Sequence, residues 1–170
     1  MYRQNDIVVE KKMFRQVLGK SAGVLFYFVQ YGAIAHCALE FGGDFVVCSG
    51  PSMEPTIESG DVVLTEHIST YRTLIQKGDV VITRSPVNPH YFLCKRVVGL
   101  AGDNVFNGTS QTFKRIPPGH VWLEGDNKDN STDSREYGPV PYALIRSRVF
   151  FKIWPPRKMG TLAMMLDQNR

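Results

Sequence analysis

The sequence of 170 residues contains only three cysteines, Cys37, Cys48 and Cys94. They cannot all pair within the chain and none forms a Cys-x-x-Cys motif, which excludes zinc and thioredoxin-type sites built on such motifs. The metalloprotease motif His-Glu-x-x-His is absent. A Gly-x-Ser-x-Gly elbow is also absent, and none of the four histidines lies in a recognisable catalytic-triad motif. We therefore expect no metal and no other cofactor.

The sequence also has little excess charge, with a formal net charge of +4. Its basic residues form no stripe interleaved with aromatic side chains, so nucleic-acid binding is not expected. Internal repeats and low-complexity tracts are missing as well. The composition, 43% hydrophobic and 21% charged, is that of an ordinary globular chain. The length suits one domain together with an anchor.

A single long stretch, residues 21–39, contains no formally charged residue. About 20 apolar residues cross a bilayer as a helix, so we expect a transmembrane anchor here. The preceding segment, residues 1–20, carries five basic residues. This charge predicts that residues 1–20 stay on the side of synthesis or import, while everything after Glu40 crosses. The alternatives are an amphipathic or core helix, and a signal sequence removed near Ala33–Ala35.

After the uncharged stretch, short apolar runs alternate with Gly, Pro, Asn and Asp. This pattern predicts a mainly β domain over residues 40–155, built as folded sheets or an open barrel, with a tail over residues 156–170. Two prolines at Pro139–Pro141 exclude a central strand there, and one helical turn is expected at Tyr142–Arg146. The expected strands are Phe45–Cys48, Asp61–Leu64, Asp79–Arg84, Tyr91–Val98, Asp103–Phe106, His120–Glu124 and Val149–Ile153.

Ser52 is a candidate nucleophile because its neighbours make a rigid turn. Gly50 permits unusual backbone angles, Pro51 fixes φ, and Pro55 prevents the preceding strand from continuing. A loop held in this way can expose the hydroxyl and leave its own backbone N–H free for an oxyanion. An ordinary Ser- and Pro-rich turn is the alternative, since Ser-x-x-Pro is a common sequence.

Lys95 is the candidate base, because a neutral lysine can activate a serine. Its pKa must fall from about 10.4 to roughly 8, which costs about 3 kcal/mol and which burial can supply. In a strand, Leu93, Lys95 and Val97 share one face, so Lys95 lies between two aliphatic side chains. Arg96 cannot replace it, because guanidinium does not deprotonate in proteins. A solvated lysine is the alternative, and Cys94 is interpreted as a small buried hydrophobe rather than a thiol nucleophile.

The residues around Ser52 and around Lys95 form two motif segments, and Gly60–Val63 and Gly78–Val81 lie between them. A third segment, Gly125–Arg135, concentrates hydrogen-bonding side chains. In this order the segments resemble the type I signal peptidases, membrane-bound serine endopeptidases with a Ser–Lys dyad. The resemblance covers roughly residues 49–153, and the motifs are specific only in combination.

Within that family the chain most resembles the subunit 1 type of the mitochondrial inner membrane peptidases. The residues that carry this likeness are the segments Gly50–Thr56 and Gly119–Asn127, the Asp-Ser-Arg triplet at Asp133–Arg135 and the end Phe150–Pro155, together with the compact length.

The resemblance implies roles for individual residues. These are the catalytic Ser52 and Lys95, the lysine-orienting Ser131 with a bracing pair of Asp133 and Arg135, backbone oxyanion donors at Gly50 and Ser52, and substrate contacts at Met53, Phe92, Leu93 and Cys94. Many bacterial relatives carry a serine at the position of Gly50, so a side-chain oxyanion donor is missing here. Losing one such donor can cost roughly 10²- to 10³-fold in rate. For the third segment, the alternative is an Asn- and Asp-rich surface loop.

The implied activity is removal of sorting presequences from proteins delivered to the mitochondrial intermembrane space. The implied partners are presequence-bearing precursors, a sister catalytic subunit and the inner membrane. Alternatives are another organellar or a bacterial signal peptidase, an autocleaving repressor, which would need a DNA-binding module, and a non-catalytic membrane-anchored partner. Sequons at Asn107 and Asn130 disfavour a secretory lumen, because the second would place a glycan inside the candidate site.

Overall fold

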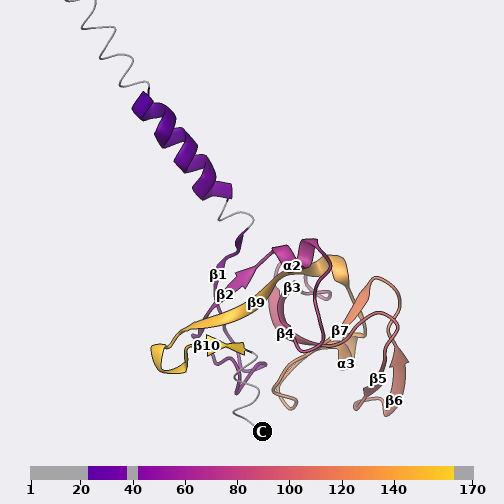
Figure 1. The fold of residues 1–170 in the computed structure, drawn as a ribbon. Coiled ribbons are helices and arrows are strands. Elements are labelled where there is room, and N and C mark those ends of the chain that lie inside the picture. Colours follow the sequence, from indigo (N-terminus) through magenta and orange to yellow (C-terminus); the bar gives the residue numbers. More distant parts are fainter. Residues whose placement is uncertain (1–22, 38–41, 163–170) are drawn as a thin grey trace, which may run out of the picture. The chain divides into compact units, whose positions relative to one another are not determined.

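The computed structural model describes residues 23–37 and 42–162. The chain divides into two compact units, Met1–Glu40 and Phe41–Arg170. In the first unit, residues 23–37 form a helix within the stretch expected to span a membrane (Figure 1). Among the described residues, no helix combines the length and the apolar character needed to cross a bilayer. The expected basic segment 1–20, the ends of the expected span and residues 163–170 of the tail lie outside the described residues.

The second unit is mainly β, as predicted, and its described residues also form short helical turns. Its strands are β1 (Phe45–Val47), β2 (Val62–Glu66), β3 (Val80–Arg84), β4 (Phe92–Gly99), β5 (Asn104–Asn107), β6 (Thr112–Arg115), β7 (His120–Glu124), β8 (Val140–Pro141), β9 (Ile145–Trp154) and β10 (Gly160–Thr161). The helical turns are α2 (Ile68–Tyr71), α3 (Ser134–Tyr137), η1 (Tyr142–Leu144) and η2 (Pro156–Lys158).

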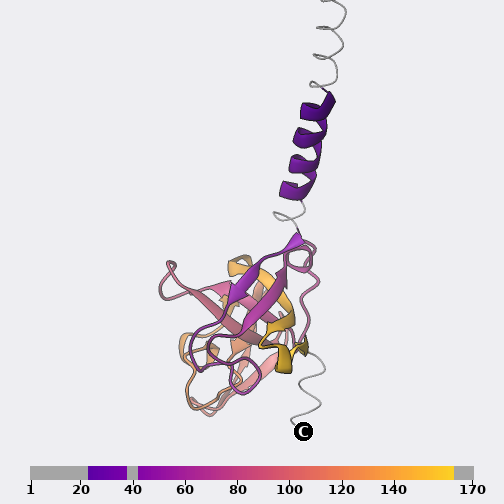
Figure 2. The same ribbon diagram turned by 90° about the vertical axis from the view of Figure 1, so that its left-hand side faces the viewer.

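The larger sheet has the strand order β1-β2-β9-β3-β4-β7-β8, with β10 also paired to β9, and all its pairs are antiparallel. Strands β5 and β6 form a separate hairpin. Figures 1 and 2 show the larger sheet curling into an open half-barrel. Register shifts in the pairs of β9 with β2 and with β3, and in that of β4 with β7, accompany this curvature, because bulges bend and twist a strand.

All seven predicted strands are present, His120–Glu124 with its predicted bounds and the other six with shifted ends, and the described residues contain three further strands that were not predicted. Strand β6 is exposed along its whole length and lacks the apolar alternation on which the prediction rested. Strand β8 contains Pro141 and lies at the end of the sheet, where proline is tolerated. The helical turn expected at Tyr142–Arg146 is one 3₁₀ turn, Tyr142–Leu144, after which β9 begins.

The larger sheet is packed on both faces around β3. Val80 and Ile82 belong to one apolar cluster, whereas Val81 belongs to a second cluster. Successive side chains of a strand point to opposite faces, so these clusters lie on opposite sides of the sheet. The loop between β1 and β2 packs Met53 and Ile57 into the first cluster. The sheet therefore supports the loop that carries Ser52.

Candidate active site

The loop that carries Ser52 is held to the sheet by residues that follow the serine. Ser52 itself is partly exposed, while Met53 and Ile57 are 2% and 1% exposed. Between these two residues, the Thr56 carbonyl accepts a hydrogen bond from Nζ of the buried Lys152 of β9, at 2.9 Å. Apolar packing and a buried ammonium thus fix the loop while the serine remains accessible.

Gly50 adopts a left-handed backbone with φ of 92°, a conformation that other residues rarely take. A Cβ added there would meet no atom within 4 Å, so the backbone conformation and not lack of space favours glycine. Two residues before Ser52, the chain consequently offers only its backbone to an oxyanion.

Lys95 lies in β4 and is 3% exposed. It is paired with Val81 of β3 and shares a face with Val97, which is fully buried. Burial lowers the pKa of Lys95, although the nearby Asp133 carboxylate acts in the opposite direction. The side chain is therefore placed to exist as a neutral amine at a lower pH than an exposed lysine.

Ser131 joins Lys95 to a carboxylate. Lys95 Nζ donates to Ser131 Oγ at 2.8 Å, and this hydroxyl donates to Asp133 Oδ2, also at 2.8 Å. Because its single proton is used toward Asp133, Ser131 can only accept from the lysine. A neutral Lys95 would thus keep an N–H directed at Ser131 and turn its lone pair elsewhere.

Asp133 is fully buried and ion-paired with Arg135, at 2.8 Å between Nε and Oδ1. Burial by itself raises the pKa of Asp133. The hydrogen bonds from Arg135, from the Gly125 N–H and from Ser131 outweigh that effect and lower it. Asp133 is therefore an ionised acceptor that keeps the Ser131 hydroxyl oriented.

Gly125 brings the first and third segments together. A Cβ built on Gly125 would lie 2.2 Å from Ser131 Oγ and 2.4 Å from the Ser52 carbonyl oxygen. Both atoms therefore approach the same backbone position, and Ser131 is in turn bonded to Lys95. The fold thus brings the Ser52 backbone and Ser131, the hydrogen-bond partner of Lys95, to one glycine.

Two further residues of this region were not singled out from the sequence. Asp126 accepts hydrogen bonds from Arg96 Nε and Nη2 at 2.7 and 2.6 Å, forming a partly buried bidentate ion pair. Asn127 donates its backbone N–H to the Ser52 carbonyl and its side-chain amide to the Pro51 carbonyl, each at 3.1 Å. The sequence feature that could have pointed to these two residues is their position directly after Gly125 in the third segment.

The four residues expected to contact the substrate differ in how exposed their side chains are. Phe92 is exposed and Leu93 is partly exposed on β4. Met53 is 2% exposed and packs into the first apolar cluster. Cys94 packs against the same cluster, beside Cys48. Hydrogen bonding to the Cys48 thiol and burial raise the pKa of the Cys94 thiol, which disfavours a thiolate nucleophile.

Other side chains with catalytic potential lie apart from this arrangement. His67 contacts Asp44 and the Arg146 carbonyl, and His120 contacts the Pro118 carbonyl. Within residues 23–37 and 42–162, no group of His, Cys, Asp and Glu could hold a metal ion.

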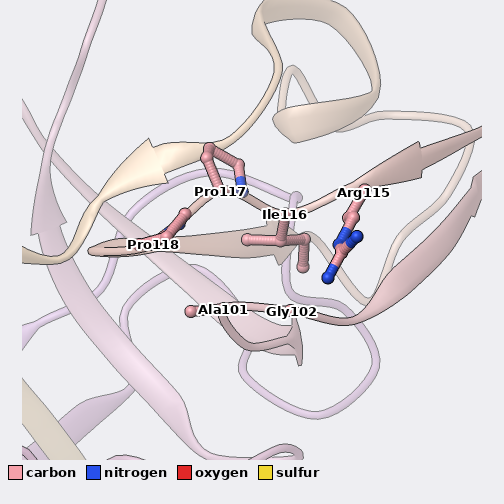
Figure 3. A pocket seen from close by; sticks show the side chains of 6 residues that line it. All are labelled: Ala101, Gly102, Arg115, Ile116, Pro117 and Pro118. Atoms are coloured by element: carbon pink, nitrogen blue, oxygen red, sulfur yellow. The ribbon is translucent and has the colours of Figure 1, made fainter.

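One pocket lies on another part of the second unit, between the turn after β4 and the segment joining β6 to β7 (Figure 3). Its lining residues are Ala101, Gly102, Arg115, Ile116, Pro117 and Pro118. Arg115 is the only ionisable one among them, so the pocket offers no general base.

Asn107 of the first sequon is 5% exposed, and its amide donates to the Arg135 carbonyl at 2.9 Å. In this conformation its nitrogen is already committed inside the protein and is not accessible for glycosylation.

Comparisons with known proteins show which family and which structures the chain resembles. A family model described as "Signal peptidase, peptidase S26" matches residues 21–107 and 106–154. Mitochondrial inner membrane protease subunit 1 of Homo sapiens is 54% identical over 162 residues, which are 93% of this chain and 98% of that protein. Subunit 2 of Danio rerio is 41% identical over 122 residues, 71% of this chain and 67% of that protein. A signal peptidase I structure from Enterococcus faecalis V583 is 20% identical with a TM-score of 0.38, covering 44% of this chain and 95% of that one.

Proposed function

The chain belongs to the peptidase S26 family of signal peptidases and is a serine protease of that type, and we propose that it removes sorting presequences from proteins delivered to the mitochondrial intermembrane space. In this proposal Ser52 is the nucleophile and Lys95 the general base. The observation that carries the assignment is the buried Lys95 amine, bonded to Ser131 beside the glycine that also contacts Ser52. The names of the relatives support the mitochondrial setting.

The proposed reaction proceeds through an ester. Ser52 Oγ attacks the scissile carbonyl carbon while neutral Lys95 takes the hydroxyl proton, and the backbone N–H of Ser52 donates to the resulting oxyanion. When the intermediate collapses, the C–N bond breaks and Lys95 returns the proton to the leaving amine. Lys95 then takes a proton from a water molecule, whose oxygen attacks the ester carbon. The bond from that carbon to Ser52 Oγ breaks, Lys95 returns the proton to Oγ, and the product leaves with a new carboxyl group. Ser131 and Asp133 keep the amine oriented through these steps.

The substrate is proposed to bind as an added strand. One edge of β4 is paired with β3 over Phe92–Arg96. The opposite edge pairs with β7 only from Arg96 onward, so on the β7 side Phe92–Lys95 carries no partner strand within the described part of the chain. An extended presequence can lie between this edge and the segment entering Ser52, held by main-chain hydrogen bonds. Its alternate side chains would then reach shallow pockets, and relatives of this type favour small residues one and three positions before the cut.

The direct test of the proposed function is cleavage of a presequence peptide by the detergent-solubilised full chain, alone and with the sister subunit. Cleavage by the native chain and its loss in Ser52→Ala, with unchanged thermal unfolding, is the expected result. A native chain that cleaves nothing under either condition would instead be a non-catalytic partner subunit.

The pH dependence of cleavage is a second expected result. Only the neutral form of Lys95 can accept the Ser52 proton, and its neutral fraction rises with pH. Since burial lowers the pKa of Lys95, kcat/KM should rise with pH and level off below the range of an ordinary lysine, about 10.4. A limb at about pH 6 to 7 that disappears when His67 or His120 is replaced would identify a histidine base instead.

Residues 21–39 are proposed to anchor the chain in the inner membrane, with residues 1–20 in the matrix and the domain from Glu40 onward in the intermembrane space. The uncharged stretch and its basic flank support this topology. Protease added to mitochondria with a ruptured outer membrane should digest the catalytic domain. A domain that stays protected until the inner membrane is dissolved would lie in the matrix.

A further inference from the structure

We propose that Asn127 is a positioning residue that sets the direction and strength of the oxyanion donor at Ser52. The inference rests on the proposed function, since it concerns the same Ser52 and Lys95. Its basis is that one residue holds both peptide groups flanking the nucleophile. The amide of Asn127 donates to the Pro51 carbonyl and its backbone N–H donates to the Ser52 carbonyl, each at 3.1 Å.

The Pro51–Ser52 peptide group is the one whose orientation matters. Its carbonyl accepts from Asn127 Nδ2 and also from the Glu54 N–H, at 3.2 Å. In a trans peptide the C=O and N–H point in opposite directions, so fixing the carbonyl fixes the direction of the Ser52 N–H. Within the described residues this N–H donates to no protein acceptor, which leaves it free for an oxyanion. A hydrogen bond to the carbonyl also polarises the same peptide and strengthens its N–H as a donor.

Asn127 is itself tied to the strand of the base. The preceding residue, Asp126, is held by two hydrogen bonds from Arg96, the neighbour of Lys95 in β4. The Asn127 backbone is thereby linked to the Lys95 strand, and its two donors reach the Ser52 loop. This connection sets the relative position of nucleophile and base across two segments that are distant in sequence.

The absence of a side chain at Gly50 makes this arrangement consequential. Without a hydroxyl donor two residues before Ser52, stabilisation of the oxyanion depends more strongly on the backbone N–H. A tilt of the Pro51–Ser52 peptide therefore weakens a larger share of that stabilisation. Truncating Asn127 should lower the rate of the chemical step about 10- to 100-fold, as expected for a misaligned rather than a deleted donor.

The test compares the full chain, with its sister subunit, as native protein, Asn127→Ala, isosteric Asn127→Asp and Asn130→Ala. Asn130 is exposed in the same loop, and its backbone N–H donates to the Asn127 carbonyl. Alanine keeps this backbone hydrogen bond, so Asn130→Ala is the matched control. Asn127→Ala should lower kcat about 10- to 100-fold, leave KM within about twofold and keep the acidic limb of the pH profile in place, because Lys95 is unchanged. Asn127→Asp, which keeps the shape but loses the amide donor, should also lower kcat.

A peptide aldehyde distinguishes positioning from a general structural defect. Ser52 Oγ adds to the aldehyde carbon, and the former carbonyl oxygen then occupies the oxyanion site. The peptide alcohol of the same sequence forms no such adduct. Affinity for the aldehyde should fall in Asn127→Ala by the factor seen in kcat, whereas affinity for the alcohol should stay unchanged.

Three outcomes overturn the inference while leaving the proposed function intact. They are native kcat in Asn127→Ala, equal losses of aldehyde and alcohol affinity, and a fall in activity matched by Asn130→Ala. In contrast, a native chain that cleaves no presequence would refute the proposed function itself, so the two failures are distinguishable.

Discussion

Replacing Lys95 by arginine is expected to abolish presequence cleavage even though the positive charge is retained. Arginine stays protonated and cannot accept the Ser52 proton, and its planar group does not fit a site shaped around one amine bonded to Ser131. We expect kcat/KM to fall about 10⁴-fold or more, as for the loss of a catalytic base acting with its nucleophile. Initial rates of presequence cleavage by equal amounts of native and variant protein measure the effect.

Two further variants make this result interpretable. Lys95→Ala should be as inactive as Lys95→Arg, because both lack a neutral amine. Lys77→Arg is the matched control, since Lys77 is exposed and its ion pair with Asp103 at 2.9 Å can be kept by arginine. Substantial cleavage by Lys95→Arg would show that Lys95 is not the base.

Replacing Gly125 by alanine is expected to reduce activity strongly, although the substitution removes no catalytic side chain. The new Cβ would lie 2.2 Å from Ser131 Oγ and 2.4 Å from the Ser52 carbonyl oxygen. Rotation of the hydroxyl would still leave Ser131 Cβ 2.6 Å away, and the Ser52 carbonyl belongs to the backbone, so the chain must shift at Ser131 and at Ser52. A displacement approaching 1 Å can cost about 10²-fold in rate, and we expect at least that loss in kcat.

Gly108→Ala provides the control for this second variant. A Cβ at Gly108 meets no atom within 4 Å and its backbone is not left-handed, so alanine should be tolerated there. Thermal unfolding of both variants separates a local shift from loss of the fold. Native activity in Gly125→Ala would mean that the geometry between Ser52 and Lys95 does not depend on contact with this glycine.

Local sequence patterns were sufficient for the features that depend on near neighbours. Alternation along residues 91–98 predicted a strand in which Lys95 shares a face with aliphatic side chains, and Lys95 is indeed 3% exposed beside buried Val97. Short apolar runs between turn residues similarly predicted seven of the ten strands. The prediction failed at β6, whose residues are all exposed, because a strand stabilised only by its hairpin partner needs no apolar face.

Side-chain direction in the turn was less predictable. Met53 follows the candidate nucleophile and was expected to contact substrate, yet it packs into the first apolar cluster. In an irregular loop there is no fixed period from which the inward side chains can be read. Asn127 was overlooked for a related reason, because its two acceptors lie 75 and 76 positions away in the chain.

By itself, the sequence determined the chemical groups available to this protein: a serine in a proline-pinned turn, a lysine between aliphatic neighbours, and a polar third segment that together mark the signal peptidase family. Only the tertiary structure decided how these groups meet. Ser131 reaches Lys95 across 36 positions, and Gly125 admits Ser52 and Ser131 to the same place because it lacks a side chain. The physical reason is that strand order and register bring distant segments together, and these depend on packing across the whole sheet rather than on local preference.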